Sequence, residues 1–312
     1  MSAPLDNTLY LQHFGLSEPP FSLTPDTGFF YAATPHQEAL NVLLVALHNG
    51  EGFIKVTGEV GLGKTLLCRM LLNSLAMEPG WVTAYIPNPH LSPGSIRVSL
   101  AEELGVQAGS RPTQEKLSRE ITRRLLELAQ TGQRCVLVLD EAQALPEATL
   151  ETVRLLTNLE TEKDKLLHVV LFGQPELDAR LAQASLRQLK QRITFSYTLT
   201  PLDRQASERY IQHRLRIAGQ RGTALFSAGA LAALYPAARG VPRLINILCH
   251  KALLAAYGPG AAQVGAGHMQ RAIADTEGAW QPAFWRRWWW GLTGGLATAG
   301  LLLGLVWHGL PG

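Results

Sequence analysis

The sequence is poor in cysteine and in net charge, and it has no long basic run. Its 312 residues include three cysteines, Cys68, Cys135 and Cys249, which form no CxxC pair and lie among apolar residues. We expect three reduced core thiols, which argues against a disulfide framework and favours a reducing compartment.

The net charge of +3 is too small to predict nucleic-acid binding. The first residues have no basic start and no apolar run, so we expect no secretory signal.

Prolines and aromatic residues dominate the beginning of the chain. Pro19, Pro20 and Pro25 forbid one continuous helix there. The aromatic side chains between them predict that residues 1–33 form an irregular strap on a domain surface. An amphipathic helix is expected to follow, with Thr34 as its N-cap.

From residue 53 onward, short apolar runs alternate with helical patterns. This alternation predicts an α/β domain over residues 34–200, with a parallel sheet covered by helices on both faces. Only helical patterns follow, so a small all-helical domain is expected over residues 201–278. The predicted strands are 53–57, 81–86, 135–139, 167–172 and 193–199.

The chain is uncharged from Trp288 to Trp307. A helix of that length spans ~30 Å, the thickness of the hydrocarbon core. We therefore expect a transmembrane helix over residues 288–308, joined to the body by a linker over 279–287; a buried core helix is the alternative. Arg286 and Arg287 precede the span and no basic residue follows it, which places the body in the cytoplasm.

Residues 58–65, Gly-Glu-Val-Gly-Leu-Gly-Lys-Thr, match the pattern G-x-x-x-x-G-K-[ST] between a predicted strand and a predicted helix. Glycines allow successive backbone N–H groups to point at phosphate oxygens, and the helix dipole favours the same anion. We expect Lys64 to reach the β- and γ-phosphates and Thr65 to ligate Mg²⁺. This P-loop predicts a nucleoside triphosphate site.

A second apolar strand, 135–139, ends in the acids Asp140 and Glu141. In such sheets, ligands bind at the carboxyl ends of the strands. Asp140 is expected to hold Mg²⁺ with Thr65, and Glu141 to act as the general base on the attacking water; two surface acids are the alternative. The residues expected to bind the nucleotide are Gly58, Glu59, Val60, Gly61, Leu62, Gly63, Lys64, Thr65, Leu66 and Asp140.

Four further polar side chains are candidates for catalysis. Gln174 follows a predicted strand and is expected to orient water or touch the γ-phosphate, with a plain turn residue as the alternative. Arg243 opens a helix of the small domain, from which it would reach the phosphates when the domains close. Arg192, and after it Arg187, is the candidate for an arginine that acts in trans on a neighbouring subunit. Each arginine has a solvated surface position as its alternative.

The order of these motifs resembles the AAA+ superfamily. The opening Tyr10-Leu-Gln-His-Phe-Gly-Leu-Ser-Glu-Pro-Pro-Phe-Ser-Leu-Thr-Pro-Asp, with His36-Gln-Glu-Ala-Leu and Asp140-Glu-Ala-Gln, resembles the general secretion pathway protein A family. Within that family, the likeness is greatest to members that serve biogenesis of the mannose-sensitive haemagglutinin (MSHA) type IV pilus. The resemblance covers about residues 9–276.

The resemblance implies a P-loop NTPase of the AAA+ type, with a five-stranded parallel sheet, a C-terminal helical lid and then one transmembrane helix. It implies ATP and Mg²⁺ as cofactors and self-association into a ring, expected to be a hexamer. It also implies a bacterial inner-membrane ATPase that assists assembly of a pilus or type II secretion machine and contacts its inner-membrane components. Some relatives carry a peptidoglycan-binding domain beyond the membrane; wall binding is not carried over to a sequence that stops at Gly312.

Three other functions fit parts of the sequence. A DNA-handling ATPase resembling transposition helper proteins would share the sheet and the lid, but the charge and the expected membrane helix argue against nucleic acid as a partner. A nucleotide-dependent scaffold with little turnover is disfavoured by the intact pair Asp140-Glu141. A small-molecule kinase would need an acceptor pocket, and the helical lid makes it the weaker alternative.

Overall fold

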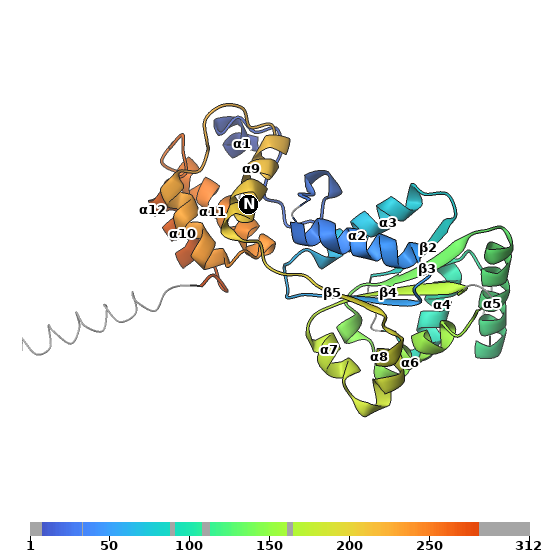
Figure 1. Ribbon diagram of the computed structural model, residues 1–312. Helices are drawn as coiled ribbons and strands as arrows, with labels where there is room; N and C mark the ends of the chain where they lie inside the picture. Colours follow the sequence, from blue (N-terminus) through green and yellow to red (C-terminus); the bar gives the residue numbers. More distant parts are fainter. Residues whose placement is uncertain (1–7, 33, 88–90, 108–112, 161–164, 281–312) are drawn as a thin grey trace, which may run out of the picture.

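The computed structural model describes residues 8–32, 34–87, 91–107, 113–160 and 165–280. Figure 1 shows a layered α/β body and, beside it, a cluster of helices, joined by the chain that leaves β5. The three cysteines are buried and free. The expected transmembrane helix and most of the linker before it lie outside the described residues. Within the described ranges, no helix is long and apolar enough to cross a membrane.

The sheet has five parallel strands, as the sequence predicts, and the structure arranges them in the order β2-β3-β4-β1-β5. Thr57 at the end of β1 pairs with Gly173 at the end of β4 and with Thr198 at the end of β5. The carboxyl ends of these strands therefore form one edge, from which the loops of the site emerge. The strands are β1 (Phe53–Thr57), β2 (Trp81–Ile86), β3 (Arg134–Leu139), β4 (Leu167–Gly173) and β5 (Phe195–Thr198).

Strand alternation divides the interior into two cores. In β3, Cys135, Leu137 and Leu139 belong to one core and Val136 and Val138 to the other, because successive side chains point to opposite faces. Figure 1 shows α2 and α3 on one face of the sheet and α4 to α8 on the other. These helices are α2 (Thr34–His48), α3 (Lys64–Ala76), α4 (Pro93–Glu103), α5 (Gln114–Gln130), α6 (Glu147–Leu156), α7 (Glu176–Leu181) and α8 (Arg187–Arg192).

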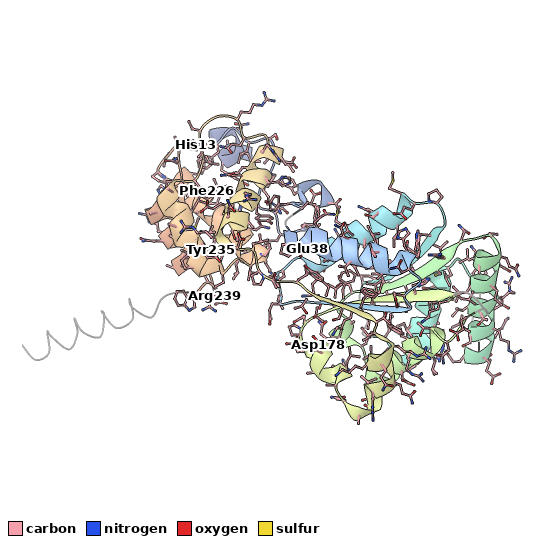
Figure 2. The ribbon with its side chains drawn as sticks, viewed as in Figure 1. His13, Glu38, Asp178, Phe226, Tyr235 and Arg239 are labelled. Carbon is pink, nitrogen blue, oxygen red and sulfur yellow. The ribbon has the colours of Figure 1, made fainter. Side chains whose placement is uncertain are left out.

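Polar contacts tie helices on both faces to strands of the sheet. Tyr197 of β5 donates its hydroxyl to Glu38 of α2 at 3.1 Å, and Lys55 of β1 donates to Asp178 of α7. Figure 2 places Glu38 and Asp178 on opposite sides of the sheet. Each side chain is partly solvated, so these contacts orient the helices more than they stabilise them.

The helical body forms a third core. Asp203 and Ser227 cap two of its helices by accepting hydrogen bonds from Ala206 N at 2.6 Å and Ala230 N at 3.2 Å. Gly240, with φ of 72°, lies against the backbone of Leu202, where no side chain fits. The helices are α9 (Arg204–Ile217), α10 (Ala228–Ala238), α11 (Pro242–Tyr257) and α12 (Ala266–Ala274).

The opening segment belongs to this helical core and is not wholly irregular. It contains the helix α1 (Thr8–His13) and the short turn η1 (Thr27–Phe29). Phe21 packs edge-on against Phe226 at a ring distance of 6.0 Å, inside the core shared with α9 to α12. His13 bonds the Ala261 carbonyl at 2.9 Å, and Figure 2 shows His13 and Phe226 in the same body. The strap thus completes the core of the helical body, which is called the lid from here on. The prolines of the strap do not predict these tertiary contacts.

Candidate functional site

The P-loop joins β1 to α3 and is shaped by glycines at left-handed positions. Gly61 has φ of 85° and Gly63 has φ of 94°, which disfavour any residue with a side chain. Gly63 is also crowded, because a Cβ there would lie 3.0 Å from His36 Nε2. That histidine, on α2, bonds the Leu62 carbonyl at 2.7 Å. The side chain of His36 on α2 therefore fixes the P-loop on the side of the helical layer. Helix α3 begins at Lys64, directly after the loop.

Lys64 is buried beneath its own loop. Its Nζ donates to the carbonyls of Gly58 at 2.6 Å and Glu59 at 3.0 Å. Burial lowers the pKa of Lys64, while the negative charges of Glu141 and Asp140 oppose that shift. A buried cation is poorly solvated, so it favours binding of a highly charged anion such as a polyphosphate.

Asp140 follows β3 and is 2% exposed. Burial raises the pKa of its carboxyl, and hydrogen bonds from the Thr65 side chain and the Glu141 backbone oppose that rise. The Glu141 N–H donates to Asp140 Oδ1 at 2.9 Å. A hydroxyl and a buried carboxylate are hard oxygen ligands, so Thr65 and Asp140 fit a Mg²⁺ ion that neutralises the buried charge.

Glu141 has the left-handed φ of 53°, uncommon for a residue with a side chain. Its Oε2 accepts from two amides: Gln143 Nε2 at 2.5 Å and Gln174 Nε2 at 3.1 Å. The structure thus brings Gln174 to Glu141 from the end of a different strand. Gln143 was missed as a site residue; it is the last residue of the Asp140-Glu-Ala-Gln run, which was the available signal.

The lid arginine and the trans candidate lie in different surroundings. The backbone N–H of Arg243 donates to the Gly61 carbonyl at 3.2 Å, so α11 touches the P-loop directly. Arg192 donates to Thr157 Oγ1 at 3.2 Å and is absent from the cavity lining described below. Arg187 is exposed at the start of α8. Arg243 is placed to meet a nucleotide of its own chain, whereas Arg192 is not.

A cavity of about 340 Å³ opens between the P-loop, the strap and the lid. Its catalytic side is formed by the P-loop with Glu141 and Gln174. Sequence reasoning missed the far side, where Tyr210 donates to Asn246 Oδ1 at 3.0 Å and Arg214 donates to Tyr210 at 3.0 Å. The lining residues are Ser22, Leu23, Thr24, Pro25, Asp26, Val60, Gly61, Gly63, Lys64, Thr65, Leu66, Glu141, Gln174, Tyr210, Arg214, Pro242, Arg243 and Asn246.

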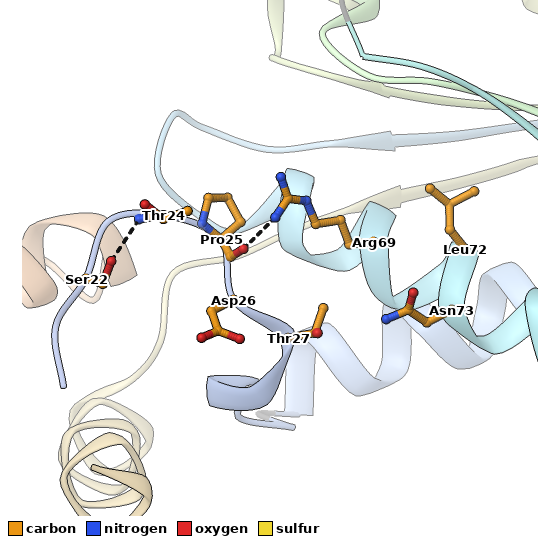
Figure 3. Close-up of a pocket in the computed structure, with 8 residues that line it drawn as sticks. All are labelled: Ser22, Thr24, Pro25, Asp26, Thr27, Arg69, Leu72 and Asn73. Atoms are coloured by element: carbon orange, nitrogen blue, oxygen red, sulfur yellow. Dashed lines mark hydrogen bonds between the residues drawn. The ribbon is translucent and has the colours of Figure 1, made fainter. Parts of the chain in front are cut away.

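The strap also borders a second pocket, of about 400 Å³, against α3 (Figure 3). Arg69 donates to the Pro25 carbonyl there, and Asp26 accepts from Gly28 N at 2.8 Å. Ser22, Thr24 and residues 25–26 line both pockets, so the strap is the wall between them.

A family model described as an AAA domain matches residues 47–181. General secretion pathway protein A of Aeromonas hydrophila is 41% identical over 301 residues, which cover 96% of this chain and 54% of that protein. The chain belongs to the general secretion pathway protein A family. This confirms the family expected from the opening and from the motifs. The chain spans about half the length of that relative.

Solved structures support the fold of this general secretion pathway protein A family member. Cdc6p from Pyrobaculum aerophilum gives a TM-score of 0.63 at 20% identity, covering 81% of this chain and 69% of that chain. The ORC2 protein of Aeropyrum pernix gives 0.60 at 15% identity, covering 84% and 74%. At such identities the likeness shows the fold alone, an α/β P-loop AAA fold.

Proposed function

We propose that this chain is a membrane-anchored AAA+ ATPase that hydrolyses Mg-ATP to assist assembly of an MSHA-type IV pilus or a type II secretion machine. One observation carries the ATPase part of the proposal. The P-loop, Glu141 from the loop after β3, and the N-terminus of lid helix α11 meet around one cavity of about 340 Å³. Phosphate binding, a base for water and a closing lid are the parts that triphosphate hydrolysis requires.

Each residue has a role that follows from its place. The P-loop amides and Lys64 bind the β- and γ-phosphates, and Arg243 approaches them from the lid. Thr65 and Asp140 would hold Mg²⁺, which supplies charge neutralisation on the phosphate oxygens when bound. Glu141 orients the water and takes its proton. Gln174, at the end of β4, holds Glu141 and faces the same cavity.

The cellular part of the proposal rests on the family and on the sequence. The curated relative is named for the general secretion pathway. The uncharged run over residues 288–308 would anchor the chain in the bacterial inner membrane, with Arg286 and Arg287 on the cytoplasmic side. The proposed partners are further copies of this chain in a hexameric ring and inner-membrane components of the pilus or secretion machine. The proposed division of the chain is a strap over residues 1–33, an ATPase domain over 34–200 and a lid over 201–278.

The test is the variant Glu141→Gln in the full chain with lipid. It keeps the volume of the side chain but cannot accept a proton, so we expect phosphate release to fall by about 10²–10⁴-fold. ATP binding, measured directly with the same preparation, is expected to stay within about threefold, because the P-loop is untouched. The exposed Glu102→Gln is the matched control and should keep wild-type turnover. Unchanged turnover in Glu141→Gln would remove Glu141 from the role of base.

A further inference from the structure

Gln143 lies in the short turn η2 (Ala142–Ala144), directly after the acid pair. Its side chain uses both ends of its amide. Nε2 donates to Glu141 Oε2 at 2.5 Å, and Oε1 accepts from the Gln174 backbone N–H at 3.0 Å. Gln174 Nε2 donates to the same carboxylate oxygen at 3.1 Å. The three residues therefore form a closed set of hydrogen bonds between the loops after β3 and β4.

The backbone around Gln143 is fixed as well. Arg180 of α7 donates to the Gln143 carbonyl. Gly173, the last residue of β4, leaves room for the side chain, since a Cβ there would lie 3.3 Å from Gln143 Oε1 and 2.8 Å from Leu177 Cδ2. Gln143 is thus held from α7 and from the strand end, so its amide has a defined position from which to orient a neighbour.

Glu141 is the neighbour that needs such support. Its backbone has the left-handed φ of 53°, and the residue lines the cavity at the P-loop. With Oε2 bonded to two amides, Oε1 is the oxygen left to accept a proton. We propose that Gln143 is a positioning residue that orients Glu141 for hydrolysis and couples it to Gln174. The inference rests on the proposed ATPase activity and deepens it.

The first experiment compares Gln143→Met with wild type in the full chain. Methionine has a similar volume and length but neither donates nor accepts in this way. We expect kcat to fall by ~10–100-fold, as when an orienting hydrogen bond is lost, with KM and directly measured ATP affinity within about threefold. Gln130→Met, on the exposed end of α5, is the matched control and should keep wild-type values. An unchanged kcat, or a loss confined to ATP affinity, overturns the proposal.

A double-mutant cycle separates positioning from a general structural effect. If Gln143 acts through Glu141, adding Gln143→Met to Glu141→Gln lowers the residual single-turnover rate by less than about threefold. An equal further loss in both backgrounds overturns the proposal. Gln143→Glu removes the donor and places a second negative charge beside Glu141, so it should lower kcat at least as much as Gln143→Met does, and it replaces Gln143→Met if that variant does not fold. A wild-type chain without ATP turnover would instead refute the proposed function.

Discussion

At the scale of single residues, His36 connects the helical layer to the phosphate loop. It is 6% exposed, and its Nε2 lies 2.7 Å from the Leu62 carbonyl, within the loop. Burial lowers the pKa of His36, while the hydrogen bond to the Leu62 carbonyl opposes that shift. The imidazole is therefore a neutral donor that fixes one carbonyl of the loop, which leaves the amides of the following residues free for phosphate.

Removing His36 is expected to destabilise the protein most at neutral pH. His36→Ala leaves a buried carbonyl unpaired, at a cost of about 1–3 kcal/mol in unfolding free energy at pH 7.5. An unfolded histidine takes a proton near pH ~6.5, whereas buried His36 stays neutral to lower pH. The wild type therefore loses stability as pH falls below that value. The difference in unfolding free energy between the wild type and His36→Ala then becomes smaller.

Denaturant unfolding at pH 7.5 and at pH 5.5 measures both effects. His48→Ala, at the exposed end of the same helix, removes a surface contact with Glu78 and is expected to cost less than about 1 kcal/mol at pH 7.5. If the difference in unfolding free energy between His36→Ala and wild type grows on acidification, His36 is not a buried, neutral imidazole.

How much of the site the sequence predicts depends on how local each contact is. The P-loop and the pair Asp140-Glu141 are contiguous patterns with their own chemistry, and they lie directly after β1 and β3. The bond from Gln174 to Glu141 joins residues 33 apart, and the bond from Tyr210 to Asn246 joins residues 36 apart. No local pattern specifies such pairs, because the fold creates them.

At the scale of elements, the prediction is best where a periodic pattern is long. The helix expected after the P-loop is α3, which runs for 13 residues from Lys64, and the strand expected over 81–86 is β2. The six-residue helices α7 and α8 were not predicted, since so few residues show no clear period. The strap was expected to lie on a surface, yet its aromatic side chains are part of the lid core.

The strap should therefore contribute strongly to stability. Phe21 is 2% exposed, and Phe21→Ala leaves a cavity beside Phe226, so we expect a loss of about 3–5 kcal/mol in unfolding free energy. Leu23, two residues further along the strap, is 55% exposed. Leu23→Ala is the matched control and should change stability by less than about 0.5 kcal/mol. Chemical denaturation of the full chain measures both; equal effects would show that the strap does not share the lid core.

At the scale of the whole molecule, the lid and the P-loop already touch. Gly61 and Arg243 meet through a backbone hydrogen bond, and a Cβ at Gly61 would lie 2.7 Å from Arg243 Cβ. Figure 1 shows that α8 lies on the other face of the sheet from α2 and α3. Arg192, at the end of α8, thus has a place in hydrolysis only if it acts on another subunit.

Mixing two inactive variants tests that arrangement. Arg192→Ala is expected to bind ATP normally and to lose about 10³-fold or more in turnover, because the transition-state charge lacks its arginine. Glu141→Gln is also inactive but still offers Arg192 to its neighbour. In the proposed ring, mixing creates sites with an intact Glu141 and a neighbouring Arg192, so phosphate release should recover. The control mixes Arg192→Ala with the double variant Arg192→Ala/Glu141→Gln, in which no site recovers an arginine. Recovery absent from mixed rings, or wild-type turnover in Arg192→Ala alone, would show that Arg192 does not act in trans.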